Sequence, residues 1–143
     1  FTFLKDTCCD PGMINEKLRA VDGMGLKIFN ANSASLLETL KMGCAGFSGV
    51  MANFHPEIYS WLCKNFEKEP EKAKKVQAFL GFASLAECQV YPVNAKYYLS
   101  LEGVPMGCDC RSKDASAFTL SRRMEIEQMR ELTEQFKRDM GIE

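Results

Sequence analysis

The chain has 143 residues, of which 46% are hydrophobic and 26% charged, and its formal net charge is -1. This mixture excludes a disordered or fibrous chain and is sufficient for one packed globular unit. Acidic and basic residues are interleaved along the chain, and no apolar run approaches the roughly 20 residues that cross a bilayer. We therefore expect a cytoplasmic protein with no nucleic-acid or membrane partner.

Seven cysteines and one histidine, His55, limit the metal and redox chemistry. Cys8 and Cys9, like Cys108 and Cys110, are too close in sequence for ordinary disulfides or for a spaced zinc motif. Reduced thiols fit best, and a metal site is the less favoured alternative. We expect no metal and no other cofactor, and we interpret His55 as a loop or capping histidine.

The chain begins with a strand, a loop and a helix. Residues 1–4 are short, apolar and aromatic, which predicts a strand buried on both faces. Asp10 before Pro11 is typical of a helix start, and Gly23 and Gly25 predict its end.

The same unit then repeats. A second strand is predicted at residues 26–30, followed by a helix that Ser33 caps and Gly43 closes, and a third strand at about residues 45–50. The next helix starts at Pro56. Alternating strands and helices indicate parallel strands joined by right-handed crossovers.

The remaining segments are predicted to be helical. Pro70 and Pro92 each open a helix, a polar loop with two cysteines follows at residues 105–116, and the last helix covers about residues 120–140. The apolar residues expected on one stripe of this last helix are Leu120, Met124, Leu132, Phe136 and Met140.

Three such strands cannot close a barrel, because an eight-stranded barrel takes about 250 residues, and an open sheet leaves its edges unpaired. The chain also opens at Phe1 rather than Met, directly with strand-like residues. We therefore expect an α/β fold in which residues 1–67 form the last three βα units, about strands 6 to 8, of a TIM (β/α)8 barrel. Residues 68–143 would form a C-terminal helical extension, and a missing N-terminal half-barrel would supply the other strands. A small independent α/β ligand-binding domain is the alternative.

Three segments carry a resemblance to a known family. They read FLKDT at residues 3–7, NANSASLLETLKMGCAGFSGVMAN at 30–53 and YPVNAKYYLSLEG at 91–103. In order and spacing they resemble the dihydrodipicolinate synthase and N-acetylneuraminate lyase family of class I pyruvate aldolases. The resemblance implies a lyase that condenses pyruvate with an aldehyde or cleaves a 2-keto acid to pyruvate. It also implies a homo-oligomer, either a tetramer or a dimer.

The resemblance identifies Lys5 as the catalytic Schiff-base lysine. A free lysine has a pKa of about 10.4, so its amine is almost always protonated at neutral pH. A nucleophilic lysine must therefore be desolvated, as at a strand end inside a barrel. The neutral amine would attack the keto carbon of pyruvate to give an iminium and then an enamine, which attacks an aldehyde. For an arbitrary lysine, a solvent-facing strand end would be the expected alternative.

Substrate-binding residues follow at the neighbouring strand ends. Thr7 is expected on the same side of the strand as Lys5, where it could hydrogen-bond substrate or simply start the loop. The resemblance implies that backbone groups around Ser48 and Gly49 contact pyruvate, whereas a packing role for this glycine is equally open. Sialic acid lyases carry acidic residues at the positions of Ser33 and Ala34, so that activity is disfavoured.

The resemblance places the catalytic tyrosine and the segments that hold the pyruvate carboxylate in the other half of the barrel. This chain alone is therefore expected to be inactive. A non-catalytic family member with a binding or regulatory role is a further alternative, although Lys5 argues against it. The aldehyde stays open between aspartate semialdehyde and a precursor of a deoxy sugar acid.

Overall fold

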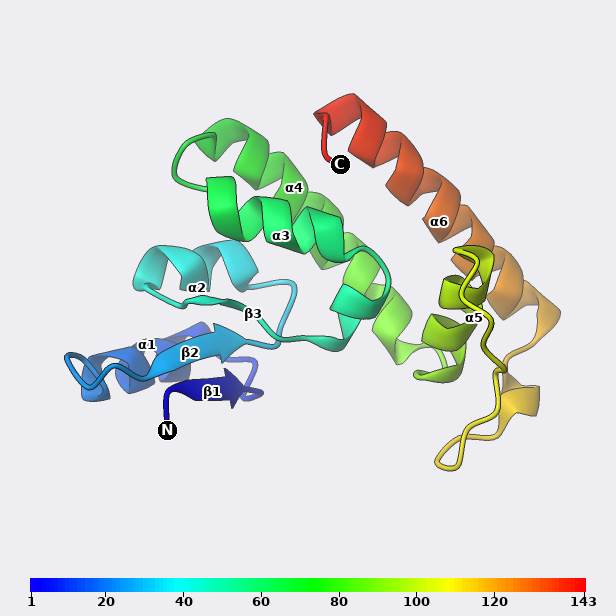
Figure 1. The fold of residues 1–143 in the computed structure, drawn as a ribbon, viewed down its shortest axis with the longest axis horizontal. Helices are drawn as coiled ribbons and strands as arrows, with labels where there is room; N and C mark the ends of the chain where they lie inside the picture. Colours follow the sequence, from blue (N-terminus) through cyan, green and yellow to red (C-terminus); the bar gives the residue numbers. More distant parts are fainter.

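The computed structural model describes all 143 residues. Strands and helices alternate in the N-terminal part, and helices make up the rest (Figure 1). The strands and helices are β1 (Phe3–Asp6), α1 (Pro11–Ala20), β2 (Lys27–Asn30), α2 (Leu36–Met42), β3 (Gly46–Phe47), α3 (Pro56–Asn65), α4 (Pro70–Ala83), α5 (Val93–Leu101) and α6 (Leu120–Met140). Three short 3-10 helices are η1 (Val50–Asn53), η2 (Ser84–Cys88) and η3 (Ala115–Ala117). None of the helices is both long and apolar enough to cross a membrane.

The three strands form one parallel sheet in the order β1-β2-β3. Lys5 of β1 pairs with Phe29 of β2, and Phe29 pairs with Gly46 of β3. The predicted parallel arrangement is confirmed. The third strand is shorter than the predicted residues 45–50, because the chain turns into η1 after one further backbone bond, from Ser48 N–H to the Asn30 carbonyl.

Proline and glycine set most helix boundaries as the sequence predicts. The Asp10 carboxylate accepts the Met13 backbone N–H at 2.9 Å and caps α1, which begins at Pro11. Gly43 (φ 112°) and Gly141 (φ 56°) end α2 and α6 in the left-handed conformation that glycine adopts most readily.

The predicted cap of α2 is wrong. Ser35, not Ser33, occupies the N-cap position, and the Ser35 backbone N–H donates to the Asn32 side chain at 3.0 Å. This turn starts the helix two residues later than predicted. The buried Ser33 hydroxyl instead bonds to the Tyr59 hydroxyl of α3 at 2.7 Å, so it links the β2–α2 connection to the next helix.

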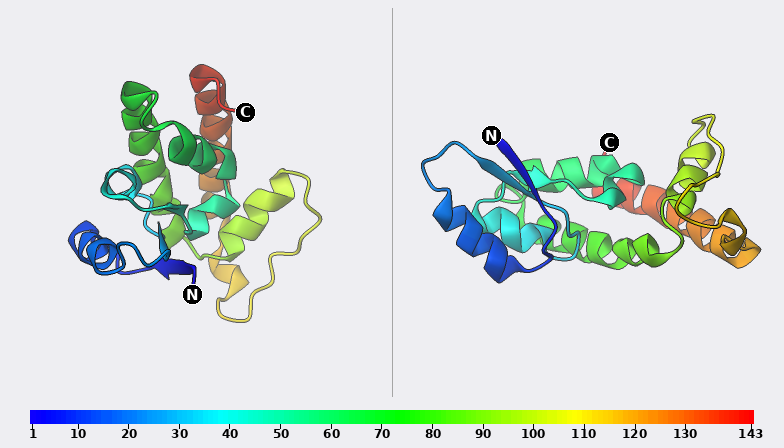
Figure 2. Two further views of the ribbon diagram at one scale, coloured as in Figure 1. Left: turned by 60° about the vertical axis from the view of Figure 1, so that its left-hand side comes forward. Right: turned by 90° about the horizontal axis from the view of Figure 1, so that it is seen from below.

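The buried side chains divide very unequally. Eighteen of them form one cluster from α2 to the C-terminal residues, whereas only Ile14, Ile28 and Cys44 form the cluster under β1, α1 and β2. Helices α1 and α2 lie along one face of the sheet. Seen from below, β1 lies in front of the helices and no helix covers it (Figure 2).

The prediction that the first strand is buried on both faces is therefore wrong. Phe3 is 53% exposed and Leu4 38% exposed, while Phe1 is fully exposed. The Phe3 ring stacks on Phe29 of β2 at a centroid distance of 4.5 Å and has no other aromatic partner. The physical reason is the position of β1 at an unpaired edge, with helices on one side only.

The apolar stripe predicted for α6 is wrong for three residues, since Leu120, Met124 and Leu132 are all exposed. The inward face instead follows the 3-4-3-4 spacing of residues that pack on the large cluster. These residues are Ile126, Met129, Thr133, Phe136 and Met140. Thr133 is the polar member, and its hydroxyl donates to the Met129 carbonyl at 2.7 Å, which removes the cost of burying it.

Candidate active site

Lys5 is the next-to-last residue of β1, so it lies at the carboxyl end of a parallel strand, as predicted. Asp6 pairs with Lys17 of α1, which places the Asp6 side chain on the helix-covered face of the sheet. Successive strand residues point to opposite faces, so Lys5 projects from the open face together with Phe3. Its side chain is exposed.

Backbone bonds bring the ends of the three strands to one edge. The Ala31 N–H donates to the Asp6 carbonyl at 3.0 Å, and the Ser48 N–H donates to the Asn30 carbonyl at 2.8 Å. The residues that follow β1, β2 and β3 therefore lie side by side. Thr7 and Ser48 occupy the two outer positions of this edge.

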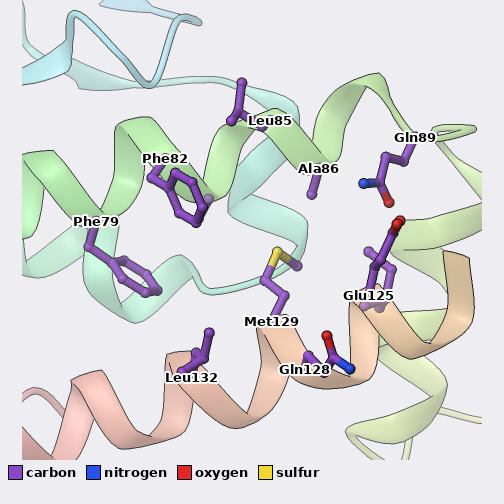
Figure 3. A pocket seen from close by; sticks show the side chains of 11 residues that line it. Phe79, Phe82, Leu85, Ala86, Gln89, Glu125, Gln128, Met129 and Leu132 are labelled. Carbon is purple, nitrogen blue, oxygen red and sulfur yellow. The ribbon is translucent and has the colours of Figure 1, made fainter. Parts of the chain in front are cut away.

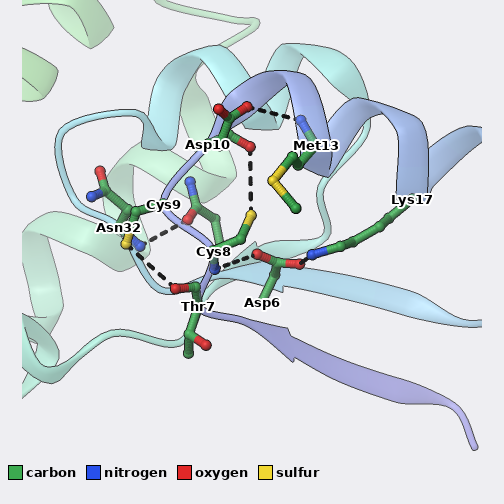
Figure 4. A network of polar contacts seen from close by, with 9 residues as sticks. Asp6, Thr7, Cys8, Cys9, Asp10, Met13, Lys17 and Asn32 are labelled. Carbon is green, nitrogen blue, oxygen red and sulfur yellow. Dashed lines mark hydrogen bonds and ion pairs between the residues drawn. The ribbon is translucent and has the colours of Figure 1, made fainter.

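Asp6 is the charged residue that holds the turn after β1 in place, and it is only 4% exposed. One carboxylate oxygen accepts the Cys8 backbone N–H at 2.9 Å, and the other pairs with the Lys17 ammonium (Figure 4). Burial alone would raise the pKa of Asp6, but the hydrogen bonds from Cys8 and Lys17 outweigh it and hold the pKa below its ordinary range. The same pair raises the Lys17 pKa. The turn next to Lys5 is thus fastened to α1.

Sequence reasoning missed this ion pair, although a signal was present. Lys17 falls at the spacing of Ile14, Leu18 and Val21, the inward face of α1, where a lysine requires a buried acceptor. Asp6, at the end of the adjacent strand, supplies it.

Thr7 follows β1 and is exposed. Its side chain points away from that of Asp6 (Figure 4). Its carbonyl lies 3.6 Å from the Cys9 sulfur. Cys9 itself has a left-handed backbone (φ 59°), which sharpens the turn after β1.

Close packing requires a glycine at position 49. A Cβ at this position would lie 2.4 Å from the Ala31 carbonyl oxygen and 2.2 Å from the Phe47 ring. Any side chain would therefore displace backbone at the strand ends. The packing role of Gly49 that the sequence left open is therefore supported by its close approach to Ala31 and Phe47. The pyruvate contact of Ser48 and Gly49 stays a prediction.

Asn30 is a second polar residue that sequence reasoning missed. It is fully buried, and its amide donates to the hydroxyls of Thr39 at 2.9 Å and Ser35 at 3.1 Å. Its oxygen accepts the Asn32 backbone N–H at 2.7 Å. The end of β2 is thereby tied to α2, which keeps the edge in register.

Two apolar grooves lie away from the predicted site residues. An apolar groove of about 390 Å³ runs between α4, η2 and α6, with Phe82, Met129 and Leu132 among its lining (Figure 3). A smaller one of about 300 Å³ lies between β3 and α3 and includes Phe29. Neither includes the four predicted site residues, and no cluster of three or more metal-binding side chains is present.

His55 differs from its predicted role. It occupies the N-cap position of α3, but its ring makes no cap bond and is 1% exposed. The ring stacks on Tyr59 at 5.5 Å and meets Phe79 edge-on at 5.7 Å. It is a buried aromatic residue of the helical core.

The class defined by this arrangement is an α/β protein with parallel strands and polar residues gathered at their carboxyl ends. The family model of the dihydrodipicolinate synthetase family matches residues 4–133. The chain therefore belongs to this family. No curated protein sequence matches it.

Solved structures share the fold. Dihydrodipicolinate synthase from Bacillus anthracis superposes with a TM-score of 0.81 at 16% identity, covering 92% of this chain and 44% of its own. The 4-hydroxy-tetrahydrodipicolinate synthase of Methylacidiphilum fumariolicum gives 0.81 at 19% identity, covering 99% and 47%. A prophage protein of the family from E. coli, solved in complex with pyruvate, gives 0.77 at 20% identity, covering 96% and 46%. The chain thus spans less than half the length of these relatives.

Proposed function

We propose that this chain is the lysine-bearing part of a class I pyruvate lyase, in which Lys5 forms the Schiff base. The observation that carries the proposal is the position of Lys5. In a chain of the dihydrodipicolinate synthetase family, it lies at the carboxyl end of a parallel strand and projects from the uncovered face. Active sites of barrel enzymes gather at this end of the strands.

The chemistry requires a neutral amine. A lysine becomes nucleophilic when its surroundings exclude water, because desolvation favours the uncharged form. Lys5 is exposed on this face, beside the stacked rings of Phe3 and Phe29. We infer that further strands cover the face in the working enzyme and complete an apolar wall around the amine.

The division of the chain follows from this proposal. Residues 1–67 would complete a TIM barrel as about its last three βα units, and residues 68–143 would be the helical extension. The relatives are more than twice as long as the part that matches, which supports a preceding half-barrel. That half would provide the groups that hold the pyruvate carboxylate and transfer protons, so this chain alone would not turn over.

In the proposed reaction, the Lys5 amine attacks the keto carbon of pyruvate and water leaves, which gives an iminium. Its positive nitrogen draws electrons from the methyl carbon, which loses a proton to give an enamine. The enamine adds to an aldehyde, and hydrolysis releases the product and the free amine. The reverse sequence cleaves a 2-keto acid with a 4-hydroxyl group. Thr7, Ser48 and Gly49 would contact the pyruvate moiety at the same edge.

Borohydride trapping tests the proposal. The intact protein is incubated with pyruvate and reduced, and peptide mass spectrometry then locates the added group. We expect it on Lys5 and on no other lysine, and Lys5→Arg should abolish it, because a guanidinium stays protonated. Lys27 at the start of β2 and Lys96 on α5 are the internal controls. Labelling that persists in Lys5→Arg would move the site elsewhere, and an unlabelled intact protein would favour a non-catalytic binding role.

A further inference from the structure

A second group of nucleophilic side chains lies far along the chain from Lys5, in the loop between α5 and η3. Residues 104–110 form neither helix nor strand. Asp109 is exposed, whereas Cys108 and Cys110 on either side of it are half-buried and both pack against the helical core. The side chains of Cys108 and Cys110 therefore both lie on the side of the loop that faces the helical core.

Cys110 lies among groups that favour a thiolate. Its sulfur is 3.4 Å from the Ser112 hydroxyl, and the Lys96 ammonium of α5 holds the loop through the carbonyl of Asp109. The hydrogen bond from Ser112, the backbone amides of Ser112 and Lys113, and the charge of Lys96 lower the pKa of the Cys110 thiol. The half-exposed sulfur is also within reach of solvent.

We propose that Cys108 and Cys110 form a peroxide-reactive dithiol, in which Cys110 attacks the oxidant and Cys108 resolves the product. The substrate class is a small hydroperoxide, and hydrogen peroxide is the simplest member. Neither cysteine forms a disulfide in the structure, so the proposed reaction starts from the reduced dithiol.

The chemistry balances in two steps. The Cys110 thiolate attacks one peroxide oxygen, the O–O bond breaks, and the leaving hydroxide takes a proton to become water; Cys110 is then a sulfenic acid. The Cys108 sulfur next attacks the Cys110 sulfur, the S–O bond breaks, and a second water leaves. Two thiols lose two electrons and two protons, and one peroxide becomes two waters.

The bridge would be reversible. Cys108 and Cys110 are too close in sequence for an ordinary disulfide, so their bridge would be strained, and strained or exposed bridges are more easily reduced than the buried bridges of secreted proteins. The loop can supply the turn that the bridge requires, since it has no helix or strand and Gly107 precedes Cys108. A free thiol would restore the starting state.

Tryptic digestion of the intact protein provides a direct test. Cleavage after Lys96 and Arg111 releases residues 97–111, which contain these two cysteines and no other. Residues 76–96 contain only Cys88, an exposed thiol without a neighbour, as the control. After brief hydrogen peroxide, we expect peptide 97–111 to lose two hydrogens and to regain them with dithiothreitol. A peptide that stays reduced while Cys88 is oxidised would overturn the proposal.

Three variants separate the roles. Cys108→Ser should leave a Cys110 sulfenic acid that dimedone traps, whereas Cys110→Ser should suppress trapping at Cys108. Ser112→Ala should slow alkylation of Cys110 by about threefold, because it removes the hydrogen bond that contributes most to the lowered pKa, and the loss of thiolate is partly offset by greater intrinsic nucleophilicity. Equal trapping in the two serine variants would overturn the assignment of Cys110 as the attacking thiol. Alkylation rates measured on the unoxidised variants check that the loop remains accessible.

Discussion

The N-terminal sheet region and the helical region of this chain differ in how many apolar side chains they bury. Eighteen apolar side chains form one continuous cluster between α2 and the C-terminal residues, whereas the cluster beside the sheet has three, Ile14, Ile28 and Cys44. Phe3 in the sheet is half-exposed, while Leu80 in α4 is fully buried. The helical part holds most of the buried core, although Phe82, Leu85 and Leu132 remain exposed, and the sheet presents an apolar face with a lysine in it.

This difference identifies the sheet as the region with an uncovered apolar face. Parallel strands are normally covered on both faces, because crossover helices leave no polar side to the sheet. Here the helices cover one face only, and both outer strands have an unpaired edge. Covering the remaining face would bury Phe3 and Phe29 and would remove water from around Lys5, so under the proposed function the step that completes the fold would also activate the lysine.

The largest expected effect is on the free energy of unfolding, when one apolar side chain in each region is shortened to alanine. Leu80→Ala should reduce the free energy of unfolding by about 2–5 kcal/mol, because it leaves a cavity in the helical cluster. Phe3→Ala should cost about 1 kcal/mol or less in this chain, since only its stack on Phe29 is lost. Urea denaturation measures both. In a longer protein whose added strands cover the sheet, the cost of Phe3→Ala should rise, and equal costs in both settings would contradict a covered face.

Mild acid should weaken the helical region first. Burial, with a smaller contribution from Lys137, lowers the pKa of His55 to about 4, and neither ring nitrogen has a hydrogen-bond partner. The unfolded state therefore binds more protons between the ordinary pKa of 6.5 and about 4, so stability falls as the pH falls through this window. The total loss should be about 3 kcal/mol. Urea unfolding at several pH values measures the slope, and His55→Phe should flatten it.

The sheet region should respond to acid only at lower pH. The pKa of Asp6 is held below its ordinary value of 3.8, so its pairing stabilises the fold at neutral pH and is lost as the pH falls through the lowered value. Asp6→Ala should cost about 2 kcal/mol at pH 7, and Asp6→Asn should cost less, because the amide oxygen can still accept from Cys8. Lys74→Ala, which removes an exposed surface pair, is the matched control and should change stability little. An equal loss in that control would mean that burial of Asp6 is irrelevant.

The smallest expected effect concerns the joint between the two regions. Tyr59→Phe removes the hydroxyl that bonds to Ser33 and leaves the buried serine without this partner. We expect a loss of about 1 kcal/mol. The ring stack on Phe47 at 4.0 Å should persist, so near-ultraviolet circular dichroism should report unchanged aromatic packing. A double variant with Ser33→Ala should recover part of the loss, because no unpaired hydroxyl then remains.

Local signals in the sequence were sufficient for most helix boundaries. Pro11, Pro56 and Pro70 each stand at the first helical residue, and Gly141 ends α6 where predicted. Proline and glycine act through their own backbone restrictions, which neighbours in space scarcely change. The position of Lys5 at the end of a parallel strand was predictable for a similar reason, since alternating strands and helices leave few topologies.

Contacts between distant residues were not readable in this way. The Ser33 hydroxyl bonds to Tyr59, which is 26 residues away, so its actual role could not be inferred from the local sequence. The inward face of α6 depends on where α4 and α5 lie against it, so Leu132 faces out and Thr133 faces in. Burial of His55 likewise requires Tyr59 and Phe79 from two helices.

The sequence by itself determined the order of strands and helices, the parallel sheet and the place of Lys5 at its edge, because these follow from local backbone preferences and chain connectivity. Only the tertiary structure decided which face of β1 is open, that Asp6 and Lys17 fasten the turn beside Lys5, and which residues of α6 are buried. Burial and pairing depend on atoms brought together from far along the chain. Hydrophobic periodicity predicts how often a helix residue faces inward, but it does not identify the residue against which that side chain packs.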